Sequence, residues 1–281
     1  MDRQDGSSGI DLPERLISLC RCAMLRPICM RRLIHSVQHM PLSSLIAGGE
    51  LIRAAGGDGV ELGTSRSRHL GFLPGFLTPA GAYRELLEPV AHAGTAITVP
   101  QLYRPTPSVL RGSFTARDEA IAAALIVGSI AATGPAVFLG GHSRGGQAAW
   151  LAAEQLQHEG IRISGLVLID PVDGGNPRVP ERFATARSTD FGFDPLIVGA
   201  ANAGRCAPEA VNHEWFARAA GSSRHVVIDG MGHGDVLDGI AGYVARRLCR
   251  GSSLDPRVAR ERVAELIEGY VKGASASPDG P

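Results

Sequence analysis

Residues 136–147, Ala-Val-Phe-Leu-Gly-Gly-His-Ser-Arg-Gly-Gly-Gln, decide the fold of this chain of 281 residues. The apolar run Ala136–Gly140 predicts a buried strand, and the Gly- and Ala-rich stretch from Arg144 to His158 predicts a helix. Between them lies Ser143, in the pattern G-x-S-x-G. A strand, a sharp turn and a helix in this order expose a serine at the carboxyl edge of a parallel sheet. The alternative is a glycine-rich turn that carries an inert serine.

Outward from this stretch, short apolar runs alternate with helical patterns along the chain. The runs lack polar–apolar alternation, which is typical of parallel strands that are covered on both faces and joined by helices. Residues 51–273 are therefore predicted to form one α/β domain, with a mostly parallel central sheet covered by helices on both faces. The predicted strands are His69–Leu73, Ala96–Pro100, Ala136–Gly140, Ser164–Ile169, Leu196–Ala200 and Arg224–Ile228. The predicted helices are Pro79–His92, Thr115–Ala132, Arg144–His158, Pro208–Ala220, Asp235–Cys249 and Pro256–Lys272, and residues 274–281 are expected to be a disordered tail.

Charge and cysteine content exclude several classes of protein. The 28 Lys+Arg balance the 28 Asp+Glu, which argues against a nucleic-acid partner and against a polybasic membrane patch. The five cysteines have neither the density of a disulfide framework nor the spacing of a zinc site, so no metal site is expected. We expect free or buried thiols, with a Cys206–Cys249 bridge as the alternative; the others are Cys20, Cys22 and Cys29.

The N-terminal extension, residues 1–50, lacks the basic and apolar regions of a secretory signal, which leaves the cytoplasm or a plastid as the expected location. From Leu16 to Gly49 it has arginines but no acidic residue, as in a transit segment or an amphipathic surface helix that contacts a membrane peripherally. An ordinary helix broken at Pro27 is the alternative. The charge-free stretch Ala120–Ser143 is long enough to cross a bilayer, but its glycines and Pro135 favour a buried helix followed by a buried strand.

A serine hydroxyl is a poor nucleophile near neutral pH and needs a histidine base that is oriented by an acid. In this fold the chain order is Ser, acid, His. His233 is the predicted base, because it lies in the loop Gly230–Gly234 just past the last strand. Three other histidines follow Ser143: His158 at the far end of a helix, His213 within a helix and His225 inside a strand.

The predicted acid is Asp170, which directly follows an all-apolar strand and lies between the serine and the histidine in the chain. Asp173 is the rival, with capping of a turn as its alternative role. Asp194 and Asp229 lie at strand margins and fit less well.

Two backbone amides, those of Phe76 and Arg144, are the predicted oxyanion hole. Phe76 lies in the loop after the first predicted strand, where Pro74 has no N–H to donate, and Arg144 directly follows the serine at a helix N-terminus. The segment Pro180–Phe193 carries three aromatic residues and is expected either to cap a lipophilic pocket or to be an ordinary surface connection; they are Phe183, Phe191 and Phe193.

With these residues assembled, the chain resembles the chlorophyllases, a branch of the α/β-hydrolases, over about residues 69–272. The similar stretches, in order, are Gly71–Phe76 with Tyr83 and Leu86-Leu87, Pro100–Tyr103, Gly141–Gly146, Ile169–Gly174, Cys206–Pro208 with Val211–Glu214, and Gly232–Asp235 with Leu237-Asp238. Two features depart from the family pattern. Pro74 stands where the family usually has His, and residues 1–68 have no clear counterpart.

The resemblance implies a Ser143, Asp170 and His233 triad, and hydrolysis of the phytyl ester of chlorophyll to chlorophyllide and phytol without a cofactor. Its partner would be a small lipophilic ester, with chlorophyll as the expected one. A carboxylesterase or lipase that acts on another lipophilic ester remains open, because pockets diverge faster than catalytic residues. A non-catalytic binding protein with a hydrolase fold is the third hypothesis, and the intact Ser, Asp and His argue against it.

Overall fold

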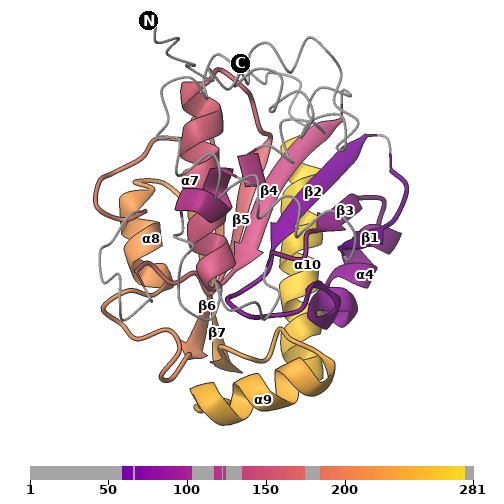
Figure 1. Ribbon diagram of the computed structural model, residues 1–281, viewed down its shortest axis with the longest axis vertical. Coiled ribbons are helices and arrows are strands. Elements are labelled where there is room, and N and C mark those ends of the chain that lie inside the picture. Colours follow the sequence, from indigo (N-terminus) through magenta and orange to yellow (C-terminus); the bar gives the residue numbers. More distant parts are fainter. Residues whose placement is uncertain are drawn as a thin grey trace, which may run out of the picture.

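The computed structural model describes residues 59–65, 67–102, 117–121, 123–124, 135–174 and 184–275. Within these residues the chain forms a seven-stranded sheet in the order β1-β3-β2-β4-β5-β6-β7 (Figure 1). The strands are β1 (Val60–Leu62), β2 (Arg68–Leu73), β3 (Ala96–Val99), β4 (Ala136–His142), β5 (Gly165–Ile169), β6 (Leu196–Asn202) and β7 (Arg224–Gly232). The helices are η1 (Ala80–Tyr83), α4 (Arg84–His92), α7 (Arg144–His158), α8 (His213–Ala219), α9 (Gly239–Cys249) and α10 (Pro256–Ser275).

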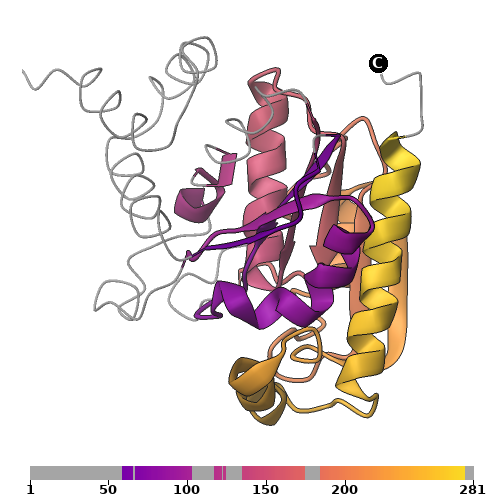
Figure 2. The ribbon, with the colours of Figure 1, turned by 90° about the vertical axis from the view of Figure 1, so that its right-hand side faces the viewer.

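The sheet is parallel except at β1, which pairs with β3 in the antiparallel sense. All five residues of β5 are buried, as predicted for a strand covered on both faces. Leu166 and Leu168 pack in one hydrophobic cluster with α7, while Val167 and Ile169 pack in the other with α4 and α10. The sheet therefore separates two hydrophobic layers, and Figure 2 shows α7 and α10 on its opposite faces. The predicted α/β architecture is confirmed.

Several element boundaries differ from the predicted ones. The short edge strand β1 was not predicted, because its three residues give too little pattern. Helix α8 begins at His213 instead of Pro208, because the Asn212 side chain accepts a hydrogen bond from the Glu214 N–H and caps the helix there. Strand β7 continues to Gly232 beyond the predicted end at Ile228, and α9 begins at Gly239.

The predictions for the two ends of the domain lie partly outside the described residues. Residues 1–50, with the expected targeting or surface helix, and residues 276–281 lie outside them, whereas α10 continues through Ala274 to Ser275, past the predicted end of the domain at 273. Of the helix predicted at Thr115–Ala132, residues 117–121 and 123–124 are described and are helical. Among the described residues, none of the helices combines the length and the apolar character that a membrane span requires.

Cys206 and Cys249 form a disulfide, with a Cα–Cα distance of 5.0 Å, so the expectation of free thiols is wrong for this pair. Cys206 follows β6, and Cys249 ends the helix that follows β7. Since β6 and β7 are neighbours in the sheet, the segments beyond their carboxyl ends meet. The sequence separation of 43 residues conceals this proximity, which only the strand order reveals.

Candidate active site

Ser143 stands at the turn between β4 and α7, in a backbone conformation that non-glycine residues rarely adopt, with φ at 55°. Such a turn projects the side chain away from the sheet edge. Its neighbour Gly145 has no room for a side chain, because a Cβ there would lie 2.2 Å from the carbonyl oxygen of Leu73. The glycine of the motif therefore lets the loop after β2 press against the start of α7, beside Ser143.

Ser143 joins His233 and Asp170 in a hydrogen-bonded chain. His233 Nε2 lies 2.9 Å from Ser143 Oγ, and His233 Nδ1 lies 2.6 Å from Asp170 Oδ2. A carboxylate can only accept, so Nδ1 carries the imidazole proton and Nε2 is left as the acceptor for the serine hydroxyl. Both His233 and Asp170 are buried. The three predicted side chains thus meet at the carboxyl edge of the sheet in the order that activation of a serine requires.

Asp170 is held by the neighbouring strand β6. It directly follows β5, and its backbone, at a φ of 40°, donates from N–H to the carbonyl oxygen of Val198 over 2.6 Å. Its Oδ1 accepts a hydrogen bond from the Ala200 N–H at 3.1 Å, while Oδ2 faces His233. Each carboxylate oxygen therefore has a different donor, and the orientation of the group is fixed.

The rival acid, Asp173, is also buried but has other partners. It accepts hydrogen bonds from the Gln147 side chain, from the N–H of Ala184 at 3.1 Å, and from Thr185. It ties the segment around Ala184 to the beginning of α7. Its role in this structure is that of an anchor.

The remaining candidates have other positions or other partners. His158 ends α7, at the opposite end of the helix from the serine. His213 and His225 pair with each other, with 2.9 Å between their ring nitrogens. Asp194 uses its backbone carbonyl to accept a hydrogen bond from Tyr270, and Asp229 lies within β7.

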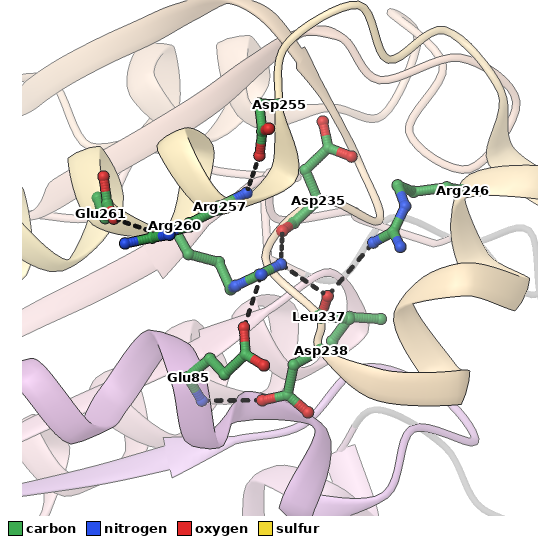
Figure 3. Close-up of polar contacts among 9 residues, drawn as sticks. All are labelled: Glu85, Asp235, Leu237, Asp238, Arg246, Asp255, Arg257, Arg260 and Glu261. Atoms are coloured by element: carbon green, nitrogen blue, oxygen red, sulfur yellow. Dashed lines mark hydrogen bonds and ion pairs between the residues drawn. The ribbon is translucent and has the colours of Figure 1, made fainter.

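The segment Asp235–Asp238, which follows His233, is held by contacts from α10 and α4 (Figure 3). Arg260, on α10, donates to the carbonyl oxygens of Asp235 and Leu237 at 3.1 and 3.2 Å and pairs with Glu85 of α4. Asp238 accepts a hydrogen bond from the Glu85 N–H. Arg260 and Glu85, which are 27 and 148 positions from His233, were not identified from the sequence, because nothing in a lone Arg or Glu indicates which loop it contacts.

The two predicted oxyanion donors lie beside the serine turn. Arg144 begins α7, and its guanidinium lies over the ring of Phe76, 5.0 Å from the ring centre. Arg144 also forms an ion pair with the buried Glu119. The amide of Gly75 donates to the hydroxyl of Tyr83, so it is already engaged within the loop. The contact places the side chains of Phe76 and Arg144 together, and their two amides stay a prediction.

Two of the three aromatic residues of the segment Pro180–Phe193 are described, and both pack on the hydrophobic core, which favours the ordinary connection. Phe191 is buried and packs edge-on against Trp150, with 4.8 Å between ring centres. Phe193 stacks on Phe191 at 5.7 Å. Both rings therefore extend the hydrophobic core over α7, and Phe183 lies outside the described residues.

Two buried groups next to the site have perturbed pKa values. Burial, and to a lesser extent the proximity of His233, lowers the pKa of His142 well below its ordinary value, so its imidazole is neutral. Burial raises the pKa of the Tyr83 hydroxyl, which keeps it protonated. The part of the chain that the structure describes contains no cluster of three or more His, Cys, Asp or Glu side chains suited to a metal ion.

The parallel sheet with helices on both faces, and the strained serine between β4 and α7, make this protein an α/β-hydrolase. A thermophilic esterase from Thermogutta terrifontis has the same fold, with a TM-score of 0.54 and 16% sequence identity over 78% of this chain and 93% of the esterase. The model of the chlorophyllase family matches residues 69–274, and the chain belongs to that family.

Two plant relatives illustrate how far the similarity extends. Chlorophyllase-1 of Arabidopsis thaliana is 29% identical over 72% of this chain and 70% of its own length. Chlorophyllase-2 of the same plant is 34% identical, and the alignment spans about half of that relative, 48% of each chain. The family and its relatives support a carboxylic-ester hydrolase.

Proposed function

We propose that this protein is a serine ester hydrolase that cleaves the phytyl ester of chlorophyll into chlorophyllide and phytol. The observation that carries the proposal is the hydrogen-bonded chain from Ser143 through His233 to Asp170, with its single consistent set of donors and acceptors. The family and the names of the plant relatives support chlorophyll as the substrate.

In the first half of the reaction, Ser143 Oγ attacks the ester carbonyl carbon while His233 Nε2 takes the serine proton. Asp170 keeps the proton on Nδ1 and stabilises the imidazolium that forms. The amides of Phe76 and Arg144 donate to the carbonyl oxygen as it becomes negative. The carbon–oxygen bond to the alcohol then breaks, and the alcohol leaves with the proton from His233.

In the second half, water replaces the alcohol. His233 accepts a proton from the water as it attacks the acyl-enzyme, and returns that proton to Ser143 when the acid is released. Overall, one ester and one water are consumed, and one acid and one alcohol are released. Every proton transfer is carried out by side chains of this chain, so the proposed reaction needs no cofactor.

An apolar face on α9 supports peripheral contact with a lipid surface, where a lipophilic ester would be found. Its exposed apolar side chains recur at the spacing of one helix face, and they are Ile240, Tyr243, Val244 and Leu248. The helix has no acidic residue, and Arg247 lies on the same face, over the ring of Tyr243. A helix with an apolar face and arginines suits a bilayer that contains anionic lipids. Helix α9 lies at the end of the molecule toward which the strands point (Figure 1).

The experiment that tests this function is release of chlorophyllide from chlorophyll a by the purified protein, with Ser143→Ala as the matched control. Release by the wild type alone is the expected result. If neither protein releases chlorophyllide, but a fluorophosphonate labels the wild type and not Ser143→Ala, the protein is a serine hydrolase with another ester substrate. If the fluorophosphonate labels neither protein, the serine is not a nucleophile and the proposed function is wrong.

A further inference from the structure

A second chain of hydrogen bonds lies next to Ser143 and His233 and joins the segments that follow or end β2, β4 and β7. The Gly75 N–H donates to the hydroxyl oxygen of Tyr83 over 2.8 Å. That oxygen lies 2.9 Å from His142 Nδ1, and His142 Nε2 lies 3.0 Å from the backbone carbonyl oxygen of His233. Gly75 follows β2, His142 ends β4, and His233 follows β7.

The direction of every bond in this chain is fixed. The carbonyl oxygen of His233 can only accept, so the proton of His142 must be on Nε2. Because burial keeps this imidazole neutral, Nδ1 has a lone pair, and the Tyr83 hydroxyl must donate to it. The hydroxyl oxygen is then left to accept from Gly75. With a neutral imidazole, no other arrangement of the protons satisfies all three contacts.

Both ends of the chain reach groups that the proposed reaction uses. Gly75 immediately precedes Phe76, a predicted oxyanion donor, and the other end holds the backbone of the base itself. The linking side chains are buried, with Tyr83 at 0% and His142 at 2% exposure. The rings of His142 and His233 also lie against each other, with 4.7 Å between their centres. A displacement in either loop would therefore change the distance between the base, the serine and the oxyanion donors.

We infer that Tyr83 and His142 are positioning residues. They hold the loop that contains Gly75 and Phe76, and the proposed base His233, at the correct distance from Ser143. The inference rests on the proposed serine hydrolase, but not on its substrate. Positioning errors of about 1 Å at a reacting centre cost on the order of 100-fold in rate. A broken link should therefore slow the chemical step and leave binding of the substrate largely unchanged.

Tyr270 offers a matched control for Tyr83→Phe. Its hydroxyl also accepts a hydrogen bond from a backbone N–H, that of Leu166 at 3.2 Å, and donates to a backbone carbonyl, that of Asp194 at 3.0 Å. It lies on α10 at the opposite end of β5 from Asp170. Tyr83→Phe and Tyr270→Phe thus remove the same hydroxyl group and orphan the same kind of donor, but only Tyr83 is linked to the site.

The experiment measures hydrolysis of p-nitrophenyl butyrate, and the rate of labelling by a fluorophosphonate, for the wild type and both variants. Both variants should lose similar thermal stability. Tyr83→Phe should lower kcat and the labelling rate on the order of 10- to 100-fold, with KM changed less than about 3-fold, while Tyr270→Phe stays near the wild type. Equal losses in the two variants, or a normal kcat in Tyr83→Phe, would overturn the inference while the proposed function stands. A wild type that the fluorophosphonate does not label would overturn both.

A second variant tests whether the chain acts as one unit. His142→Asn retains an oxygen that can accept from Tyr83. Its shorter side chain has no donor at the position of Nε2, so the bond to the His233 carbonyl is lost and kcat should also fall about 10-fold or more. If the two residues act through one chain, the loss in the double variant should be smaller than the product of the two single losses. A fully multiplicative loss would mean that they act independently, and would refute the chain as the means of positioning.

Discussion

Asp170→Asn is the substitution that tests the acid most directly, because the structure dictates how the asparagine side chain must lie. Asp170 Oδ1 accepts from the Ala200 N–H, while Oδ2 faces His233 Nδ1. An asparagine has one oxygen and one NH2 group. Its oxygen must face Ala200, since an NH2 group there would oppose a donor, so its NH2 group faces Nδ1.

That orientation changes the tautomer of the His233 imidazole. Nδ1 must become the acceptor, which moves the ring proton to Nε2, the atom that lies 2.9 Å from Ser143 Oγ. The base then has no lone pair to take the serine proton. The wrong tautomer of the base costs on the order of 10,000-fold in kcat, which is about 5.4 kcal/mol of transition-state stabilisation.

The assay is steady-state hydrolysis of a soluble p-nitrophenyl ester by Asp170→Asn, with Asp173→Asn as the control. Asp173 is buried and accepts several hydrogen bonds, so its substitution should lower stability but leave kcat within about 10-fold of the wild type. Circular dichroism establishes that both variants are folded at the assay temperature. If Asp173→Asn loses activity and Asp170→Asn retains it, the acid is assigned to the wrong residue.

Three further predictions concern stability and surface contact. Because burial lowers the pKa of His142 well below 6.5, the folded protein binds a proton there less readily than the unfolded chain, and the free energy of unfolding should fall as the pH drops below about 6.5. This residue contributes at most about 1.4 kcal/mol per pH unit, and urea titrations should show a shallower dependence for His142→Gln; an equal slope would contradict a neutral, buried imidazole. Reduction of the Cys206–Cys249 disulfide, which spans 43 residues, should lower the free energy of unfolding by up to about 4 kcal/mol, and an unchanged urea midpoint would count against the bridge. Finally, Ile240→Glu with Leu248→Glu should reduce sedimentation with vesicles of anionic and neutral phospholipid several-fold, without loss of kcat on a soluble ester; undiminished sedimentation would exclude α9 as the contact.

The fold was predictable because its main signal is local. Each buried strand is a short apolar run, and the burial of all five residues of β5 on both faces is what the absence of alternation indicated. The meeting of Ser143, Asp170 and His233 followed from one rule, that the carboxyl ends of parallel strands share an edge. It was therefore enough to know which residues end a strand. A polar residue that follows an apolar run marks that end.

What the sequence did not reveal depends on contacts between distant segments. The disulfide, the Arg260 contacts and the bonds of His142 each join residues whose proximity depends on strand order. The beginning of α9 illustrates a second reason. The helix was predicted to begin at Asp235, but Asp235 Oδ2 accepts from the Gly232 N–H and from Ser252, which holds the segment after His233 as a turn. A tertiary contact overrides the local pattern there.

Backbone strain gathers where the proposed chemistry takes place. Among the described residues, four other than glycine have a positive φ, and three of them lie in loops of the site: Leu77, Ser143 and Asp170. Conformations of this kind cost on the order of 1–3 kcal/mol each and persist only where the surroundings enforce them. For Ser143 and Asp170 the structure provides that enforcement, since their N–H groups donate to Ile169 and Val198 on the neighbouring strands. The central strands thus provide the rigidity that keeps the serine and the acid in strained but defined positions. The loop that carries His233 follows a peripheral strand, and the bonds from Arg260 and His142 provide its rigidity instead. His233, the proposed base, is therefore the member of the proposed triad whose position depends most on other side chains, and loss of those side chains should affect the proposed catalysis before it affects the fold.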